Sequence, residues 1–187
     1  MIRPIRPLSD SHDLSLSLPG NNHRHANDYL LKPMQKSDDY IVSRILWKAG
    51  KYNLPTKSSF YFHNLSPDLQ QYLSGQIEGS DSGTPVLFFT RPTREWTLLC
   101  TRQIIGHDTH HLIALYLRDI QQITTTALDP AAAGRPFRPA TMKTKTEWDE
   151  IKVIDQHNNT HLFYAARGAD LFALWNILLM AARLYNH

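Results

Sequence analysis

The 187-residue chain is 42% apolar and 20% charged, with 20 basic residues against 17 acidic ones and a formal net charge of +3. This balance is typical of one globular domain, or of one domain with an added flank. The mild charge argues against a dedicated nucleic-acid binder, and the single cysteine, Cys100, excludes an internal disulfide.

The N-terminal stretch, residues 1–36, is rich in Pro, Ser, Asn and His and shows little hydrophobic periodicity. This composition predicts an extended arm or linker. The stretch has no continuous apolar segment of the kind found in signal peptides, and no later stretch reaches the length of a membrane span. We therefore expect a cytoplasmic protein.

Residues 37–84 carry the signals of a helical flank that packs on the core. In "SDDYIVSRILWKAG", Ser37 can cap a helix and Gly50 can end it, with Tyr40, Ile41, Ile45 and Leu46 on the apolar side and Trp47 near its edge. "SSFYFHNL" is compatible with a short strand. "SPDLQQYLSGQI" predicts a second helix, because a serine cap is followed by proline in the first helical position.

From Val86 onward the pattern changes to strands. "VLFFT" predicts a short strand, and "EWTLLCTRQII" and "HLIALYLRDIQQI" predict two long strands joined across "GHDTH", where Gly106 and Asp108 supply turn chemistry. In the second long strand, alternation places His111, Ile113, Leu115 and Leu117 on one inward face. After the loop "DPAAAGRPFRPATMKTKT", a hairpin of "EWDEIKVID" and "THLFYAARG" turns at "QHNN".

The chain closes with a helix, Leu171 to Tyr185, that is apolar on nearly all sides. A helical wheel gives one broad face suited to the core and an opposite face that carries Ile177, Met180 and Leu184. We expect that opposite face to be covered either by the flank of residues 37–84 or by a partner protein.

These elements are similar to those of the pleckstrin-homology-like superfamily, in particular its bacterial branches. The resemblance covers about residues 85–187 and rests on "WTLLCTRQII", "IALYLRDIQQI", "EIKVID" and "LFYAARGADLFALWNIL". It implies an α+β fold with an antiparallel barrel or sandwich and a C-terminal capping helix. Five strands are evident where that superfamily has seven. Members of the superfamily mostly bind peptides, proteins or lipids, and the fold alone does not choose among them.

Two sets of residues are candidates for binding an anionic partner. The loop "GRPFRPATMKTK" has no acidic residue and could dock on a protein surface, a lipid headgroup or nucleic acid; the alternative is a solvated loop. Its candidate residues are Arg135, Phe137, Arg138, Lys143 and Lys145. Arginines near the first hairpin, Arg91, Arg94 and Arg102, are the candidates for a lipid headgroup, although the tip of that hairpin, "HDTHH", is histidine-rich rather than basic.

The leading hypothesis is a non-enzymatic protein-interaction module that needs no cofactor; one specific version is a bacterial immunity protein that neutralises a cognate toxin. The first alternative is a peripheral binder of anionic lipid headgroups. The second is a metal-dependent hydrolase built on two turns, "HDTHH" with His107, Asp108, His110 and His111, and "HNNTH" with His157 and His161. Their spacing matches no structural zinc motif, so no metal site is predicted. No nucleophile elbow or glycine-rich phosphate loop is present in the sequence.

Overall fold

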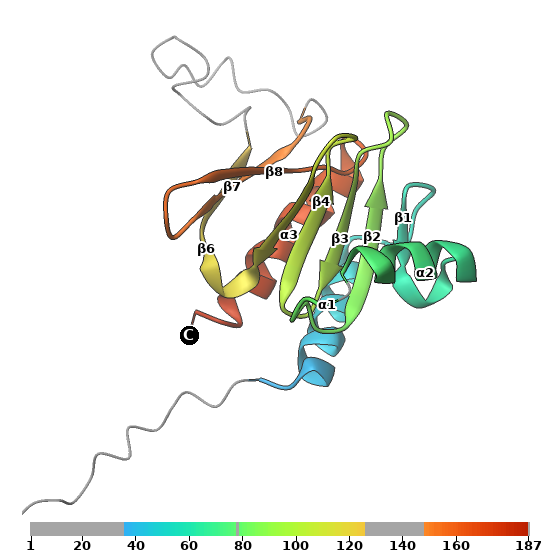
Figure 1. Cartoon of the computed structure of the whole chain (residues 1–187). Helices are drawn as coiled ribbons and strands as arrows, with labels where there is room; N and C mark the ends of the chain where they lie inside the picture. The colour runs from blue at the N-terminus through green and yellow to red at the C-terminus, as the bar shows by residue number, and fades with distance from the viewer. Residues whose placement is uncertain (1–35, 78, 126–147, 187) are drawn as a thin grey trace, which may run out of the picture. The chain divides into compact units, whose positions relative to one another are not determined.

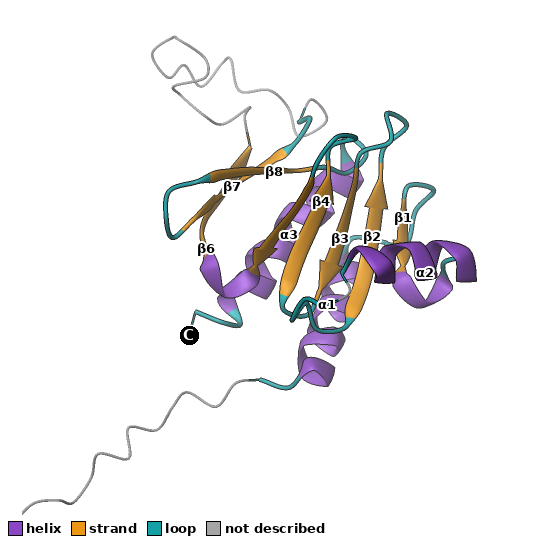
Figure 2. Cartoon of the chain, in the orientation of Figure 1, coloured by secondary structure: helices purple, strands orange, loops and turns teal. Residues whose placement is uncertain are grey.

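The computed structural model of the chain describes residues 36–77, 79–125 and 148–186 (Figures 1 and 2). The helices are α1 (Asp38–Lys51), α2 (Pro67–Gln76) and α3 (Ala169–Arg183), with short 3-10 turns η1 (Phe62–Asn64) and η2 (Leu117–Asp119). The strands are β1 (Ser59–Tyr61), β2 (Pro85–Thr90), β3 (Trp96–Cys100), β4 (Gln103–His107), β5 (Leu112–Tyr116), β6 (Ile120–Thr125), β7 (Ile151–Asp155) and β8 (Thr160–Phe163).

The described strands form two antiparallel sheets. One has five strands in the order β1-β2-β3-β4-β5, and the other has three in the order β6-β7-β8. The α+β class and the C-terminal helix are therefore as expected from the sequence. The expectation of a barrel needs correction, because the described strands stay in two separate sheets and do not close into one cylinder.

Both faces of the five-stranded sheet are apolar, because its strands alternate large hydrophobic residues on each side. One face packs against α3 and α1. The other face forms a second cluster with α2 and the segment before it, in which Leu65 and Leu73 contact the sheet residues Phe88, Leu98 and Ile105. The sheet is thus a middle layer between helices.

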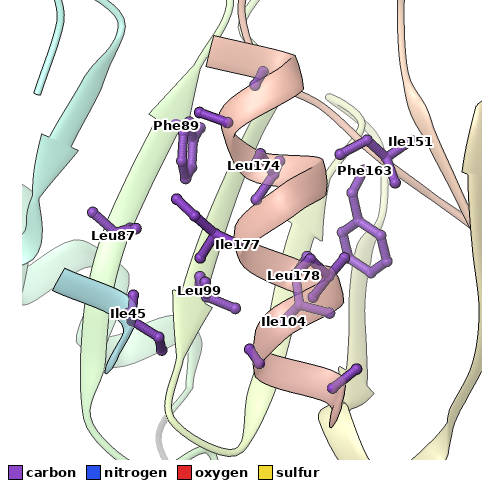
Figure 3. Close-up of a cluster of buried hydrophobic side chains, with 14 of the residues drawn as sticks. Ile45, Leu87, Phe89, Leu99, Ile104, Ile151, Phe163, Leu174, Ile177 and Leu178 are labelled. Carbon is purple, nitrogen blue, oxygen red and sulfur yellow. The ribbon is translucent and has the colours of Figure 1, made fainter. Parts of the chain in front are cut away.

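Helix α3 lies against the sheet with most of its circumference covered. Ile177 is fully buried, and Figure 3 shows it directed from α3 toward the strands that carry Leu87 and Leu99. Met180 and Leu184 are half-buried against the same core. The helical wheel placed Ile177 on the face opposite the core, and we expected that face to be covered by the flank or by a partner. Ile177 is covered within the chain, because the sheet and α1 of the flank together enclose this side of α3.

Helix α1 supplies part of the cover for α3. Ile41, Ile45 and Ala49 are fully buried in the cluster that contains the α3 side chains. The Lys36 ammonium also donates a hydrogen bond of 2.7 Å to the Leu184 carbonyl at the end of α3. The flank is not purely helical, because β1 pairs with β2 and extends the sheet.

The two long strands expected from the sequence are each divided in two. "EWTLLCTRQII" contains β3 and β4, joined by a tight turn at Thr101 and Arg102, and "HLIALYLRDIQQI" contains β5, η2 and β6. Gly106 lies inside β4 rather than in a turn, so its predicted role in turn chemistry is also corrected. The inward face of Ile113, Leu115 and Leu117 is confirmed, whereas His111 is exposed at the hairpin tip.

Candidate functional site

The outer side of α1 carries the most distinctive exposed surface among the described residues. Tyr40, Arg44, Trp47 and Lys51 recur at intervals of four, three and four residues, which places them on one face of the helix. Tyr40 is 45% exposed and Trp47 is 50% exposed, both unusual values for side chains of this size. We call these four residues the α1 outer face.

Cations hold the Trp47 indole in place. The guanidinium carbon of Arg44 lies 4.6 Å from the centroid of the Trp47 ring, and the Lys51 ammonium lies 5.6 Å from it. Such cation–π contacts restrict the ring without covering it. The Nε atom of Arg44 is buried and has no hydrogen-bond partner. The α1 outer face therefore presents an exposed aromatic ring whose position is restricted by neighbouring basic side chains.

An ion cluster fixes the N-terminus of α1 to the sheet. Arg102, in the turn between β3 and β4, donates from Nε to Asp38 at 3.2 Å and from a terminal nitrogen to the same carboxylate at 3.1 Å. Arg102 also pairs with Asp81. Two parallel bonds to one carboxylate fix its orientation as well as its position. The α1 outer face is accordingly presented by a helix that is anchored at its start and packed along its inner side.

The three arginines considered for a lipid headgroup do not converge. Arg91 and Arg94 lie in the loop between β2 and β3, and Arg102 lies in the turn at the other end of β3. Arg91 stacks over the Tyr164 ring at 5.5 Å and pairs with Glu95 at 4.0 Å, so it is already engaged. Of these three residues, only Arg94 is exposed, whereas Arg91 and Arg102 are half-buried. These three residues therefore do not form a common anion pocket.

The other candidate partner-binding residues are distributed as follows. Arg135, Phe137, Arg138, Lys143 and Lys145 lie outside the described residues. Ile177 is buried in the core, which removes it from any accessible surface, and Met180 and Leu184 remain half-buried. The sequence reading missed the α1 outer face, because it assigned Tyr40 to the apolar side. The regular spacing from Tyr40 to Lys51 in the sequence could have identified this face of the helix.

The histidine-bearing turns are held by their own hydrogen bonds. In the β4–β5 turn, Asp108 accepts the backbone N–H groups of His110 at 2.9 Å and His111 at 2.7 Å. The His107 ring stacks on Trp96, with centroids 5.5 Å apart. Within residues 36–77, 79–125 and 148–186, no three His, Cys, Asp or Glu side chains are arranged to hold a metal ion.

In the β7–β8 turn, Asp155 organises the chain. Its carboxylate accepts the backbone N–H groups of His157 and Asn159, both at 2.8 Å, and it contacts the His161 Nε2 atom at 2.9 Å. The hydrogen bond with His161 is the main reason that the pKa of Asp155 lies well below its usual range. A carboxylate with its acceptor sites filled in this way acts as a turn-former.

Replacing Asp155 with alanine is expected to lower the free energy of unfolding at pH 7 by about 1–3 kcal/mol, because two backbone donors and His161 lose their acceptor. A lowered pKa in the folded state means that this stabilisation is fully present above the unfolded pKa of about 4 and is lost progressively as the pH falls from there toward the lower folded pKa. Denaturant unfolding at pH 7 and pH 3 measures the difference, which should shrink at pH 3. Asp119→Ala, which removes a surface ion pair with Arg118, is the control and should have little effect at either pH. A difference that stays constant with pH would contradict this role.

No protein-family model, no curated protein and no solved structure matches this chain. None of the helices in the described part of the chain has the length and apolar character needed to cross a membrane. The assignment of function therefore depends on the geometry of the described surface.

Proposed function

We propose that this chain is a non-enzymatic protein-interaction module, built on a pleckstrin-homology-like core, that binds an acidic protein surface through the α1 outer face. The arrangement of strands as successive antiparallel hairpins in two sheets, followed by a C-terminal helix, supports the proposed relationship. The observation that carries the proposal is the half-exposed Trp47 between Arg44 and Lys51.

The chemistry of this face favours a protein partner. Tryptophan and arginine are the residues most enriched among those that dominate binding energy at protein interfaces. A ring that is already held by neighbouring cations loses little conformational entropy when a partner covers it. Lys48, whose ammonium lies 5.5 Å from the Tyr52 ring, extends the positive charge along the helix. The complementary partner therefore presents carboxylates around an apolar recess.

Neutralisation of a toxin is the narrower form of this proposal. It requires a toxin whose surface is acidic where the α1 outer face binds. Co-expression of the chain with such a toxin would then restore growth, and the Trp47→Ala variant would restore less. The lipid-headgroup role lacks a comparable observation, since Arg91, Arg94 and Arg102 are dispersed.

A defined peptide tests the proposal. The probe is a synthetic helical peptide of alternating Glu-rich and Leu-rich turns, titrated into the full chain and followed by the indole N–H resonance of Trp47. We expect the double variant Trp47→Ala/Lys51→Glu to bind about 30-fold more weakly, as observed when an aromatic anchor worth about 2 kcal/mol is truncated. Binding by this variant is followed by calorimetry, because the reporting indole is absent.

The matched control is Tyr72→Ala/Lys57→Glu, which removes one exposed aromatic ring and reverses one exposed lysine away from α1. This control should bind the peptide as the unmodified chain does. Equal weakening of both variants would overturn the proposal. Tight binding to vesicles of phosphatidylcholine and phosphatidylserine at physiological salt, without binding to the peptide, would overturn it in favour of a membrane surface.

A further inference from the structure

Strand β5 forms one edge of the five-stranded sheet. The next strand in the chain, β6, belongs to the other sheet, so β4 is the only described strand that pairs with β5. On the face shared with α2, the buried cluster ends at Ile105 of β4. Beyond it, Leu112 is 42% exposed and Ala114 is exposed. The edge is therefore apolar and open to solvent.

The hydrogen-bond pattern shows which backbone groups face outward. The Leu117 N–H donates to the Arg102 carbonyl at 2.9 Å, and the Asp108 N–H donates to the His111 carbonyl at 3.2 Å. Because antiparallel pairs alternate, and Ile113 lies opposite Gly106, the odd-numbered residues 111–117 bond to β4. The N–H and C=O groups of Leu112, Ala114 and Tyr116 point away from the sheet, and no hydrogen bond to them is made by the described residues.

An unpaired edge of this kind is a template for another strand. Natural sheets usually protect such edges with proline, with charged side chains or with a bulge. β5 has the sequence Leu-Ile-Ala-Leu-Tyr, and its pairing with β4 is regular throughout. None of the usual protective features is present in this strand.

We propose that β5 pairs with β5 of a second copy of this chain, so that the two five-stranded sheets become one continuous sheet across a twofold axis. An antiparallel register centred on Ala114 places the outward groups of Leu112 opposite those of Tyr116 of the second copy, and Ala114 opposite Ala114. Three such pairs exchange about six backbone hydrogen bonds.

Self-pairing is favoured over a foreign strand because the edge is complementary to itself. A twofold contact brings each patch against the same patch of its partner, so a charged edge would repel its own copy. The three residues whose backbone groups point outward carry no charge. The nearest charge is the Arg118 guanidinium, 4.5 Å from the centroid of the Tyr116 ring, and this register places Arg118 opposite position 110 of the second copy rather than opposite Arg118 of that copy. The register also pairs a leucine with a tyrosine, an arrangement that stabilises antiparallel strands, and leaves the small alanine on the axis.

The expected dimer is reversible. A contact formed by one five-residue strand lies at the low end of the area found in stable interfaces, so we expect a dissociation constant on the order of micromolar. This surface is separate from the α1 outer face. Dimerisation and peptide binding can therefore succeed or fail independently.

Sedimentation velocity of the full chain over about 1–200 µM tests the proposal. The unmodified chain should pass from monomer to dimer. Ala114→Pro removes an N–H group that points outward, so it should weaken association more than tenfold while leaving the pairing with β4 intact. Ala114→Lys should do the same by placing two cations on the axis. Ser74→Lys, an equal charge change at an exposed position of α2, should dimerise normally.

A disulfide variant tests the register. Residues opposite each other in a hydrogen-bonded antiparallel pair have Cα atoms about 5.5 Å apart, which is within the range of a disulfide. Ala114→Cys should therefore form a covalent dimer under mild oxidation, whereas Ser74→Cys should not. A chain that stays monomeric throughout the concentration range, or a dimer that is unaffected by both Ala114→Lys and Ala114→Pro, would overturn the proposal.

Discussion

Replacing Ile177 with aspartate is expected to prevent this chain from folding at neutral pH. Ile177 is fully buried between α3 and the five-stranded sheet (Figure 3). Removing a buried isoleucine side chain costs about 2–5 kcal/mol, and leaving a carboxylate unpaired in its place adds several more. The sum is comparable to the total stability of a typical domain, about 5–15 kcal/mol.

Circular dichroism and size-exclusion chromatography measure this result. Ile177→Asp should lose its cooperative thermal transition and aggregate. The matched control is Ala169→Asp, an exposed position in the first turn of the same helix, where a negative charge suits the helix dipole. This control should stay folded. A folded, monomeric Ile177→Asp chain would mean that this part of α3 is accessible, and it would return Ile177 to the candidate partner-binding residues.

Helix starts and turns that depend on residues close together in the sequence were predicted correctly. Ser37 accepts the Tyr40 N–H as a helix cap, although α1 continues past Gly50 to Lys51. Pro67 begins α2, and the hairpin of β7 and β8 turns at residues 156–159 as expected. Caps, helix-starting prolines and turn residues act through local hydrogen bonds and backbone preferences, so they can be read without the tertiary structure.

The turn between β3 and β4 could not be read in this way, because distant residues hold it. The Thr101 side chain accepts the Thr84 N–H at 2.9 Å, and the Thr101 carbonyl accepts the Tyr185 hydroxyl at 2.6 Å. Arg102 is held by Asp38 and Asp81. The segment contains neither glycine nor proline, so its sequence resembles that of one continuous strand.

The candidate site could be predicted from the sequence only in part, for a related reason. Apolar periodicity identifies the buried side of α1, but it counts Tyr40 as apolar and does not show that the side chain is exposed. The helical wheel identified a second apolar face of α3 that contains Ile177, but it could not show whether the flank or a partner covers that face. Here α1 and the sheet both cover α3, so neighbours from distant parts of the chain determine which residues are exposed.

Gly106 of β4 packs closely against Phe163 of β8 in the other sheet, and enlarging it is expected to destabilise the fold. A Cβ atom at this position would lie 2.8 Å from Cδ1 and 3.1 Å from Cε1 of Phe163 in β8. Phe163 is fully buried, so its ring cannot move into solvent. Glycine is thus required for packing, because any side chain here would collide with the second sheet.

We expect Gly106→Ala to lower the free energy of unfolding by about 1–3 kcal/mol, the usual cost of overpacking, and Gly106→Val to lower it further. Chemical denaturation measures both. Gly75→Ala is the control, because no atom lies within 4 Å of an added Cβ at that helical position. That variant should be more stable than the unmodified chain by about 0.5–1 kcal/mol.

A second substitution separates steric collision from loss of backbone freedom. Phe163→Leu alone should destabilise the fold by leaving unfilled space, but in the Gly106→Ala background it should cost less, because the smaller side chain makes room for the new methyl group. The double-mutant cycle should therefore give a favourable coupling of about 0.5 kcal/mol or more. Strict additivity would show that the ring does not contact position 106, and the packing of β8 on β4 would then need another explanation.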